Sequence, residues 1–119
     1  MKNIIIIGSR RRDTTEDFIK TKKCFLGIYE KGDMIVSGGC PKGGDRFAEI
    51  LAREYDVPIK IFRAEWTTWG RTAGFIRNTD IAKSGNRIIA CVAPDRTGGT
   101  EDTVKKFKKF HPNTLVNLC

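Results

Sequence analysis

Four consecutive isoleucines, Ile4 to Ile7, are the feature that most restricts what this chain can fold into. Side chains alternate between the two faces of a β-strand, so an unbroken β-branched run puts apolar groups on both faces. A strand of this kind is typical of a parallel sheet covered by helices on each side. The run is also too short to cross a bilayer. Asn3–Ile7 therefore predicts a central strand of an α/β domain.

The rest of the chain alternates between strand-like and helix-like segments. Four further strands are predicted at residues 33–37, 57–62, 87–93 and 114–118. Helices are predicted after the capping signal at Asp13–Glu16, after Asp45, across 71–83 and across 100–110. Such alternation forms right-handed βαβ units. We expect one domain over residues 1–119, a Rossmann-like three-layer sandwich with a five-stranded, mostly parallel sheet in the order 3-2-1-4-5.

The composition is that of an ordinary soluble globular protein, with 39% hydrophobic and 30% charged residues. Met1 to Asn3 lead directly into the first strand, so we expect no signal peptide and a cytoplasmic location. The four cysteines, at positions 24, 40, 91 and 119, form no Cys-x-x-Cys pair, and the chain has one histidine. This pattern favours free thiols and predicts neither a metal site nor a bound cofactor.

The formal net charge of +8 predicts attraction to polyanions, without choosing among a nucleotide, a nucleic acid and a membrane surface. Most lysines fall on predicted helix faces, where solvation explains them. Arg10, Arg71 and Arg77 are more informative because they fall beside predicted loops. We expect no membrane association, and the sequence leaves a homo-oligomer open.

Glycine-rich loops follow the first, second and fourth predicted strands. In a doubly wound sheet, ligands bind beyond the carboxyl ends of the strands. Glycine lets backbone N–H groups approach a phosphate, and the next helix presents its positive N-terminus. One such loop is as consistent with tight turn geometry as with a ligand, whereas two facing loops favour the ligand. The ligand-binding residues predicted in these loops are Gly8, Ser9, Arg10, Gly38, Gly39, Gly43, Gly44, Asp45, Gly98, Gly99 and Thr100.

Neither glycine loop matches a Walker A motif or the dinucleotide Gly-x-Gly-x-x-Gly fingerprint, which disfavours P-loop hydrolysis and cofactor-dependent oxidoreduction. Asp45 has two interpretations. As an N-cap it would satisfy backbone donors and contribute about 1 kcal/mol. As a ligand group it would accept from a ribose hydroxyl. The cap is favoured because a carboxylate repels phosphate.

The segment from Trp66 to Asn78 is the most unusual, because glycines and arginines interrupt a helical pattern. Residues 66–70 are predicted to form a loop. Arg71 and Arg77 have the geometry to clamp a phosphate bidentately, and Trp66 is a candidate to stack on a base. The competing interpretation makes Trp66 part of the core and the arginines solvated. The ligand-binding residues predicted in this segment are Trp66, Gly70, Arg71, Arg77 and Asn78.

With these residues assembled, the chain resembles the SLOG superfamily of Rossmann-like nucleotide-binding proteins, in particular its YspA-like branch. The resemblance rests on Ile6–Arg10, Ser37–Asp45, Gly98–Thr100 and, most specifically, the Trp-x-x-x-Gly-Arg-x-Ala-Gly-x-x-Arg-Asn pattern of residues 66–78. It spans residues 6 to 100 in order. It implies a nucleotide-related ligand held between the Gly38–Asp45 and Gly98–Thr100 loops.

Some SLOG relatives, the LOG-type phosphoribohydrolases, cleave the N-glycosidic bond of nucleoside monophosphates with a Glu and an Arg. Their Gly-Gly-x-Gly-Thr-x-x-Glu region resembles the segment that starts at Gly98 here, but Thr103 stands where that Glu is expected. The candidate catalytic residues that this resemblance implies are Arg77, Glu101 and Asp102. Other relatives bind single-stranded DNA, and the net charge of +8 here is consistent with attraction to such a polyanion.

Three functions are therefore predicted, in order. The first is binding of a nucleotide or nucleotide-derived phosphorylated ligand, for sensing or sequestering. The second is N-glycoside hydrolysis of a nucleotide. The third is binding of single-stranded nucleic acid, placed last because the chain lacks a recognised nucleic-acid motif.

Overall fold

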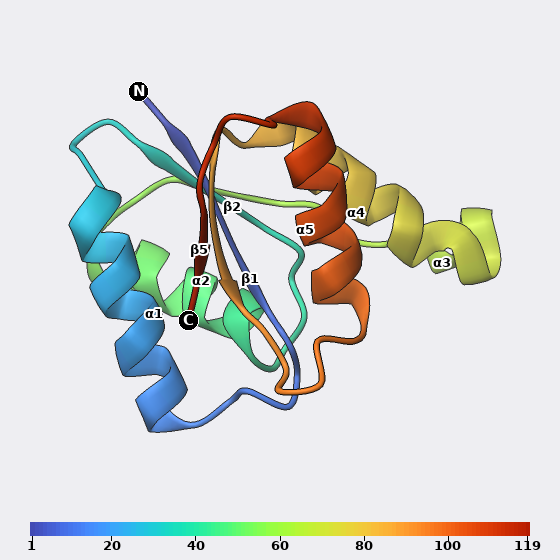
Figure 1. The fold of residues 1–119 in the computed structure, drawn as a ribbon, viewed down its shortest axis with the longest axis horizontal. Helices are drawn as coiled ribbons and strands as arrows, with labels where there is room; N and C mark the ends of the chain where they lie inside the picture. Colours follow the sequence, from blue (N-terminus) through green and yellow to red (C-terminus); the bar gives the residue numbers. More distant parts are fainter.

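The computed structural model describes all residues, 1 to 119, as one α/β unit (Figure 1). The elements, in chain order, are β1 (Asn3–Gly8), α1 (Thr15–Ile28), β2 (Met34–Ser37), α2 (Gly44–Glu54), β3 (Ile59–Ile61), α3 (Trp66–Trp69), the 3-10 helix η1 (Gly70–Thr72), α4 (Ala73–Ser84), β4 (Arg87–Cys91), α5 (Gly99–Phe110) and β5 (Val116–Leu118).

The five strands form one sheet in the order β3-β2-β1-β4-β5. Every neighbouring pair is parallel, with Ile5 of β1 opposite Val36 of β2 on one side and Ile88 of β4 on the other. The predicted fold class and strand order are thereby confirmed, and the sheet is entirely parallel.

The isoleucine run of β1 supplies the core on both faces of the sheet, as the sequence predicts. Ile4 and Ile6 pack with Phe25 of α1 and Leu51 of α2. Ile5 and Ile7 belong to the opposite cluster, which contains Ile81 and Ala82 of α4 and Val104 and Phe107 of α5. Helices α1 and α2 therefore cover one face and α4 and α5 the other (Figure 1).

The capping signal before α1 is shifted by one residue from its predicted place. Thr14 is the N-cap, and Asp17 supplies the carboxylate of the capping box. Asp13 instead accepts a hydrogen bond from the N–H of Gly43 at 2.7 Å and pairs with Arg46 at 2.8 Å. This aspartate therefore ties the loop after β1 to the start of α2.

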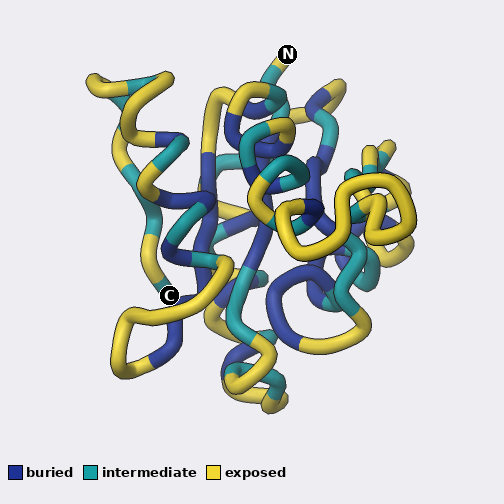
Figure 2. The backbone as a smooth tube through the Cα atoms, turned by 90° about the vertical axis from the view of Figure 1, so that its right-hand side faces the viewer, coloured by how far each residue is buried: buried dark blue, intermediate teal, exposed yellow.

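The prediction of a loop at residues 66–70 is wrong. Residues Trp66–Trp69 form the short helix α3, which ends where Gly70 adopts a φ of 58°. The 3-10 turn η1 follows, so α4 begins at Ala73 and not at Arg71. Helix α3 projects from the body of the domain (Figure 1) and is exposed along its length (Figure 2).

The four cysteines are free in the structure. No helix combines the length and the apolar character that crossing a membrane would require.

Candidate ligand-binding site

A cavity of about 470 Å³ opens at the carboxyl edge of the sheet, where the loops after β1 and β4 lead to helices on opposite faces. This crossing point is where doubly wound sheets bind ligands, and the volume is in the range of small-molecule sites. The lining residues are Ile7, Gly8, Ser9, Arg10, Arg11, Cys40, Asp45, Arg77, Asn78, Ile81, Thr97, Gly98, Gly99, Thr100 and Thr103.

The glycine pair before α2 allows close packing and does not line the cavity. A Cβ on Gly44 would lie 2.2 Å from the carbonyl carbon of Ile7, so only glycine lets α2 start directly against β1. The preceding Gly43 donates its N–H to Asp13. From the predicted loop Gly38–Asp45, the residues that reach the cavity are Cys40 and Asp45. Gly38, Gly39, Gly43 and Gly44 do not line it.

The N-terminus of α5 opens into the same cavity. Gly98, the N-cap residue, has no side chain that could bond the first N–H groups of the helix, and no other side chain caps them. Gly98, Gly99 and Thr100, which the sequence predicts as ligand-binding residues, all line the cavity. The first backbone N–H groups of an α-helix lack intrahelical acceptors and carry the positive end of its dipole. This part of the wall is suited to an anion.

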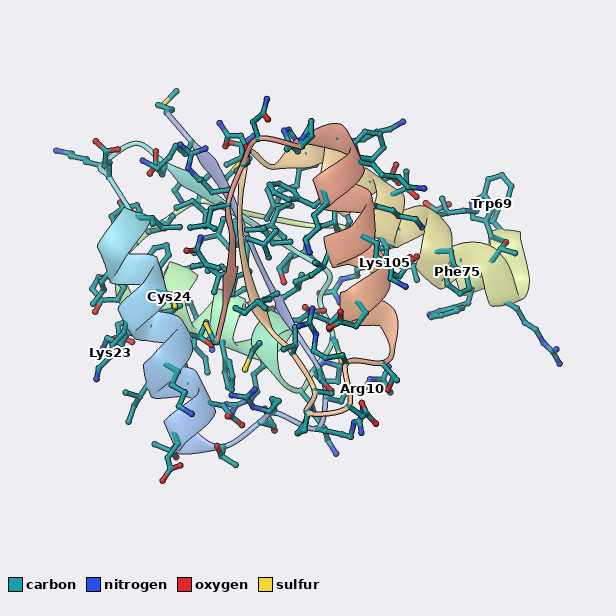
Figure 3. All side chains as sticks on the ribbon, viewed as in Figure 1. Arg10, Lys23, Cys24, Trp69, Phe75 and Lys105 are labelled. Carbon is teal, nitrogen blue, oxygen red and sulfur yellow. The ribbon has the colours of Figure 1, made fainter.

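The three consecutive arginines after β1 take three different roles. Arg10 lines the cavity, is exposed at its edge (Figure 3) and forms no ion pair with the protein. Arg11 also lines the cavity, but it is paired with Asp95. Arg12 turns inward, binding Asp17 at 2.7 Å and the carbonyl oxygen of Val92 at 2.8 Å. Arg10 is therefore the arginine of the three with a free charge.

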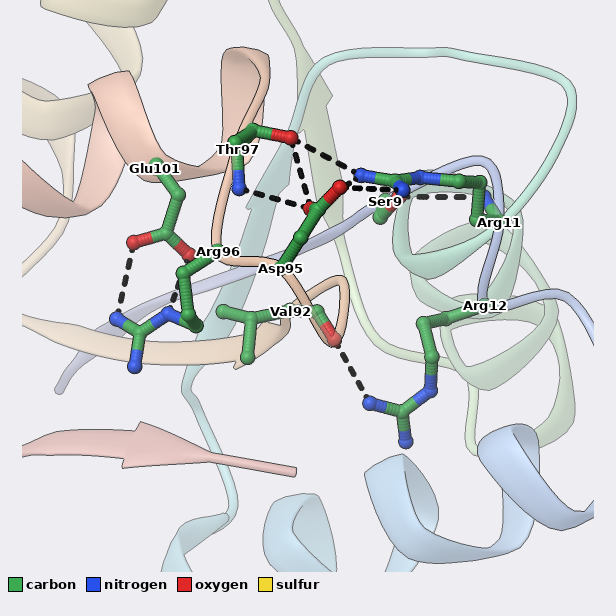
Figure 4. Close-up of polar contacts among 8 residues, drawn as sticks. All are labelled: Ser9, Arg11, Arg12, Val92, Asp95, Arg96, Thr97 and Glu101. Atoms are coloured by element: carbon green, nitrogen blue, oxygen red, sulfur yellow. Dashed lines mark hydrogen bonds and ion pairs between the residues drawn. The ribbon is translucent and has the colours of Figure 1, made fainter.

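The Arg11–Asp95 pair fastens the loop after β1 to the loop after β4 (Figure 4). The guanidinium donates to both carboxylate oxygens, at 2.9 and 2.6 Å, and also to the hydroxyl of Thr97 at 3.1 Å. The hydrogen bond from Arg11 keeps the pKa of Asp95 well below its usual value. Two loops that wall the cavity are thus held at a fixed separation.

Arg77 crosses from α4 to the opposite wall of the cavity. Its Nε donates to the side-chain oxygen of Asn78 at 3.0 Å, and one terminal nitrogen donates to the carbonyl oxygen of Gly38 at 3.0 Å. Both acceptors are neutral, and no carboxylate lies within ion-pair distance. The guanidinium charge is therefore positioned by hydrogen bonds without being neutralised.

The buried amide of Asn78 connects Arg77 to α5. Its nitrogen donates to the carbonyl oxygen of Gly99 at 3.3 Å and to Asp102 at 3.1 Å. The hydroxyl of Thr103 donates to the same Gly99 carbonyl at 3.2 Å. These contacts fix the first turn of α5 relative to Arg77. The guanidinium of Arg77 and the positive N-terminus of α5 are therefore held in one relative position.

Asp45 is the buried carboxyl of the cavity, and the prediction that it caps α2 is wrong. The N-cap of α2 is Gly43, and Asp45 lies within the first turn, where it accepts from the N–H of Cys40 at 3.0 Å. Burial raises the pKa of Asp45 to about 6, although the Cys40 N–H and the charge of Arg77 favour ionisation. Any side chain at Gly38 would collide with both Arg77 and Asp45, so that glycine lets the two groups approach.

Neither of the carboxylates proposed for catalysis from the sequence lines the cavity. Glu101 accepts two hydrogen bonds from Arg96, at 2.7 and 2.9 Å (Figure 4). Asp102 is held by the amide of Asn78 and by the ammonium group of Lys106, the latter at 2.8 Å. Both groups are thus engaged with the protein itself. No cluster of three or more His, Cys, Asp or Glu side chains has the arrangement of a metal site.

Besides Gly38, Gly39, Gly43 and Gly44, three further residues predicted at the site lie outside the cavity. Trp66, Gly70 and Arg71 are exposed on the projecting α3–η1 segment. Conversely, pattern-based prediction missed Ile7, Arg11, Cys40, Ile81, Thr97 and Thr103. Two signals were available for these residues. Arg11 and Cys40 adjoin predicted residues, and Thr103 stands one helical turn after Gly99, on the same face of α5.

The fold and the cavity define the class of this protein as a Rossmann-like α/β domain with a polar cleft at the carboxyl edge of a parallel sheet. The chain is similar to the Gene 61 protein of Mycobacterium phage D29, with 26% identity over 117 residues that cover 92% of this chain and 90% of the phage protein. No protein-family model matches the chain. No solved structure matches it either.

Proposed function

We propose that this domain binds a phosphorylated, nucleotide-type ligand in the cavity at the carboxyl edge of the sheet. One observation carries the proposal. Two guanidinium groups without carboxylate partners, Arg10 and Arg77, share a cavity with the uncapped N-terminus of α5. Unpaired cations beside free backbone N–H groups are the combination that binds phosphate.

The resemblance to the SLOG superfamily agrees with this ligand class. It rests on the Trp66–Asn78 pattern, and the last two residues of that pattern, Arg77 and Asn78, line the cavity. Sensing or sequestering of a nucleotide is the role that we propose for such a module. We infer a cytoplasmic location, which suits the four free cysteines. Single-stranded nucleic-acid binding and a homo-oligomeric state stay predictions.

Isothermal titration tests the proposal directly. The panel consists of mononucleotides, ADP-ribose and cyclic signalling nucleotides, and we expect at least one to bind with a Kd below 1 mM. Arg10→Ala removes one unpaired charge and is expected to weaken that binding about tenfold. Arg53→Ala is the matched control, because it removes an equal charge from the far end of α2. Equal affinity losses in both variants, or no binding by any compound, would overturn the proposal.

Asp45 gives specific support to a second candidate, N-glycoside hydrolysis of a nucleotide. This carboxyl lines the cavity beside Arg77, and its pKa of about 6 is near the value that a general base needs at neutral pH. Asp45 would take a proton from water as the water oxygen attacks C1′ of the ribose. The C–N bond would break, and the proton accepted by Asp45 would pass to the leaving base, which restores the carboxylate.

Release of free base, followed by chromatography, tests this second candidate. We expect Asp45→Asn to abolish turnover while nucleotide binding persists. The variants Glu101→Gln and Asp102→Asn test, in the same assay, the catalytic role that the sequence suggested for these two carboxylates. Absence of base release from every nucleotide that binds would leave a binding module without hydrolytic activity.

A further inference from the structure

A second cavity of about 440 Å³ lies on the other side of Arg77, which lines both cavities. It opens between the end of β3 and the α3–α4 segment. Its apolar wall consists of Ile61, Phe62, Ala64, Trp69, Ala73 and Ile76. Three of the 15 residues that line the first cavity are hydrophobic, against six of the 10 that line the second. The second cavity thus has an apolar wall beside the polar residues Arg63, Glu65 and Asp80, and Arg77 is the residue that the two cavities share.

Trp69 is the aromatic ring of this second cavity. Its side chain is half exposed on α3 (Figure 3) and lines the cavity, where an aromatic ring can stack on a flat partner. Trp66 lines neither cavity and packs over Gly74. The stacking role that the sequence suggested for Trp66 therefore suits Trp69 instead.

The rim of the second cavity carries two carboxylates, Glu65 and Asp80. Neither side chain accepts a hydrogen bond from the protein or forms an ion pair. Free carboxylates accept hydrogen bonds from the exocyclic amino groups of nucleobases. The rim therefore matches an amino-bearing ring, and the Trp69 indole matches its flat face.

We propose that the second cavity is the base subsite of a nucleotide whose phosphate occupies the first, and that the base bears an exocyclic amino group. This inference rests on the proposed function, because the position of the phosphate in the first cavity is taken from that proposal. Arg77 stands at the junction of the two cavities, where it contacts the ligand between its base and its phosphate. The ligand class is thereby narrowed to nucleotides of adenine, cytosine or guanine.

The test compares two probes, adenosine 5′-monophosphate and ribose 5-phosphate, by isothermal titration. We expect the wild-type chain to bind the nucleotide at least tenfold more tightly, because stacking on an aromatic side chain contributes that much or more. Trp69→Ala should remove this difference and leave ribose 5-phosphate binding unchanged. Trp66→Ala is the matched control, exposed on the same short helix, and should change neither affinity.

The outcomes separate the two proposals. Binding of neither probe would contradict the phosphate site itself. Equal binding of both probes to the wild-type chain would retain the phosphate site and overturn the base subsite. A loss of nucleotide affinity in Trp66→Ala, with Trp69→Ala unaffected, would overturn the base subsite as well.

A third probe, inosine 5′-monophosphate, tests the rim carboxylates because a carbonyl oxygen replaces the amino group of adenine. We expect the adenine nucleotide to bind several-fold more tightly, and the preference to be lost in the double variant Glu65→Gln, Asp80→Asn. A preference for inosine 5′-monophosphate would overturn the role of the amino group. Both carboxylates are exposed, so the double variant is expected to fold.

Discussion

Arg77 of α4 donates a hydrogen bond to the carbonyl oxygen of Gly38, at 3.0 Å, across the carboxyl edge of the sheet. The bond joins the loop after β2, which leads to α2 on one face of the sheet, to α4 on the other face. It also places one unpaired guanidinium on the boundary of two cavities. Loss of Arg77 should therefore have a larger effect on ligand binding than loss of any other arginine.

We expect Arg77→Lys to weaken adenosine 5′-monophosphate binding about tenfold, since a lysine keeps the charge but cannot bond Gly38, Asn78 and a phosphate together. Arg71→Ala is the control, because Arg71 is exposed and lines neither cavity. Titration calorimetry measures both. A greater loss in Arg71→Ala would place the ligand on the α3–η1 segment instead.

Asp45 should make the stability of the domain depend on pH. Its pKa is about 6 in the folded chain and near 3.8 in the unfolded chain, so the folded state binds the proton more tightly. The stabilisation is full below pH 4 and is lost as pH rises to 6. The difference of about 2 in pKa corresponds to roughly 3 kcal/mol. Chemical denaturation of wild-type and Asp45→Asn chains from pH 4 to 7 should show this loss in the wild type alone.

The same carboxylate opposes anion binding once it is ionised. Sulfate is the appropriate probe, because its charge does not change in this pH range. We expect the wild-type affinity for sulfate to fall about tenfold between pH 5 and 7.5, and the Asp45→Asn affinity to stay nearly constant. Parallel profiles in the two proteins would show that Asp45 does not face the anion.

Two glycine substitutions should have opposite effects on stability. Gly44→Ala puts a Cβ 2.2 Å from the backbone of Ile7, and we expect a loss of about 3 kcal/mol or more. Gly27→Ala meets no atom within 4 Å on the exposed side of α1, and we expect a gain of up to about 1 kcal/mol. Urea denaturation measures both. A neutral Gly44→Ala would contradict the close packing of α2 on β1.

Substitutions of the neighbouring arginines Arg10 and Arg12 should separate an effect on ligand affinity from an effect on stability. Arg12→Ala leaves the buried Asp17 without its ion-pair partner, and we expect a loss of about 2 kcal/mol in stability with ligand affinity retained. Arg10→Ala should leave the melting temperature unchanged and weaken binding. Thermal denaturation and calorimetry on both variants measure this. Reversed effects would exchange the roles assigned to the two side chains.

The two-sided core was predictable because the isoleucine run of β1 puts apolar side chains on both faces of the sheet, and the strand order followed from the analogy with doubly wound sheets. The position of the cavity followed from the topology, and Gly98 to Thr100 were correctly placed in it. The capping role predicted for Asp45 was wrong because α2 starts earlier than the sequence suggests, with its N-cap two positions before Asp45, at Gly43. This shift of two positions decides whether the carboxylate caps its own helix or lines the cavity.

Long-range side-chain pairing was beyond the reach of sequence patterns. Arg10 and Arg11 have equal local signals, yet Arg11 is neutralised by Asp95, 84 residues further along the chain. Glu101 is removed from the cavity by Arg96, whose φ of 55° turns the chain before α5. Which of two similar charges is free depends on tertiary contacts, and those contacts distinguish binding groups from structural ones.

A ¹⁵N-HSQC titration with adenosine 5′-monophosphate tests the central claim most directly, since it reports on the backbone amides that the phosphate would contact. We expect saturable shifts of the Gly98, Gly99 and Thr100 amides, with the same Kd for all three. Saturable shifts confined to other surfaces, or no saturable shift at any concentration up to 10 mM, which is about tenfold above a weak millimolar Kd, would contradict a phosphate site at the N-terminus of α5.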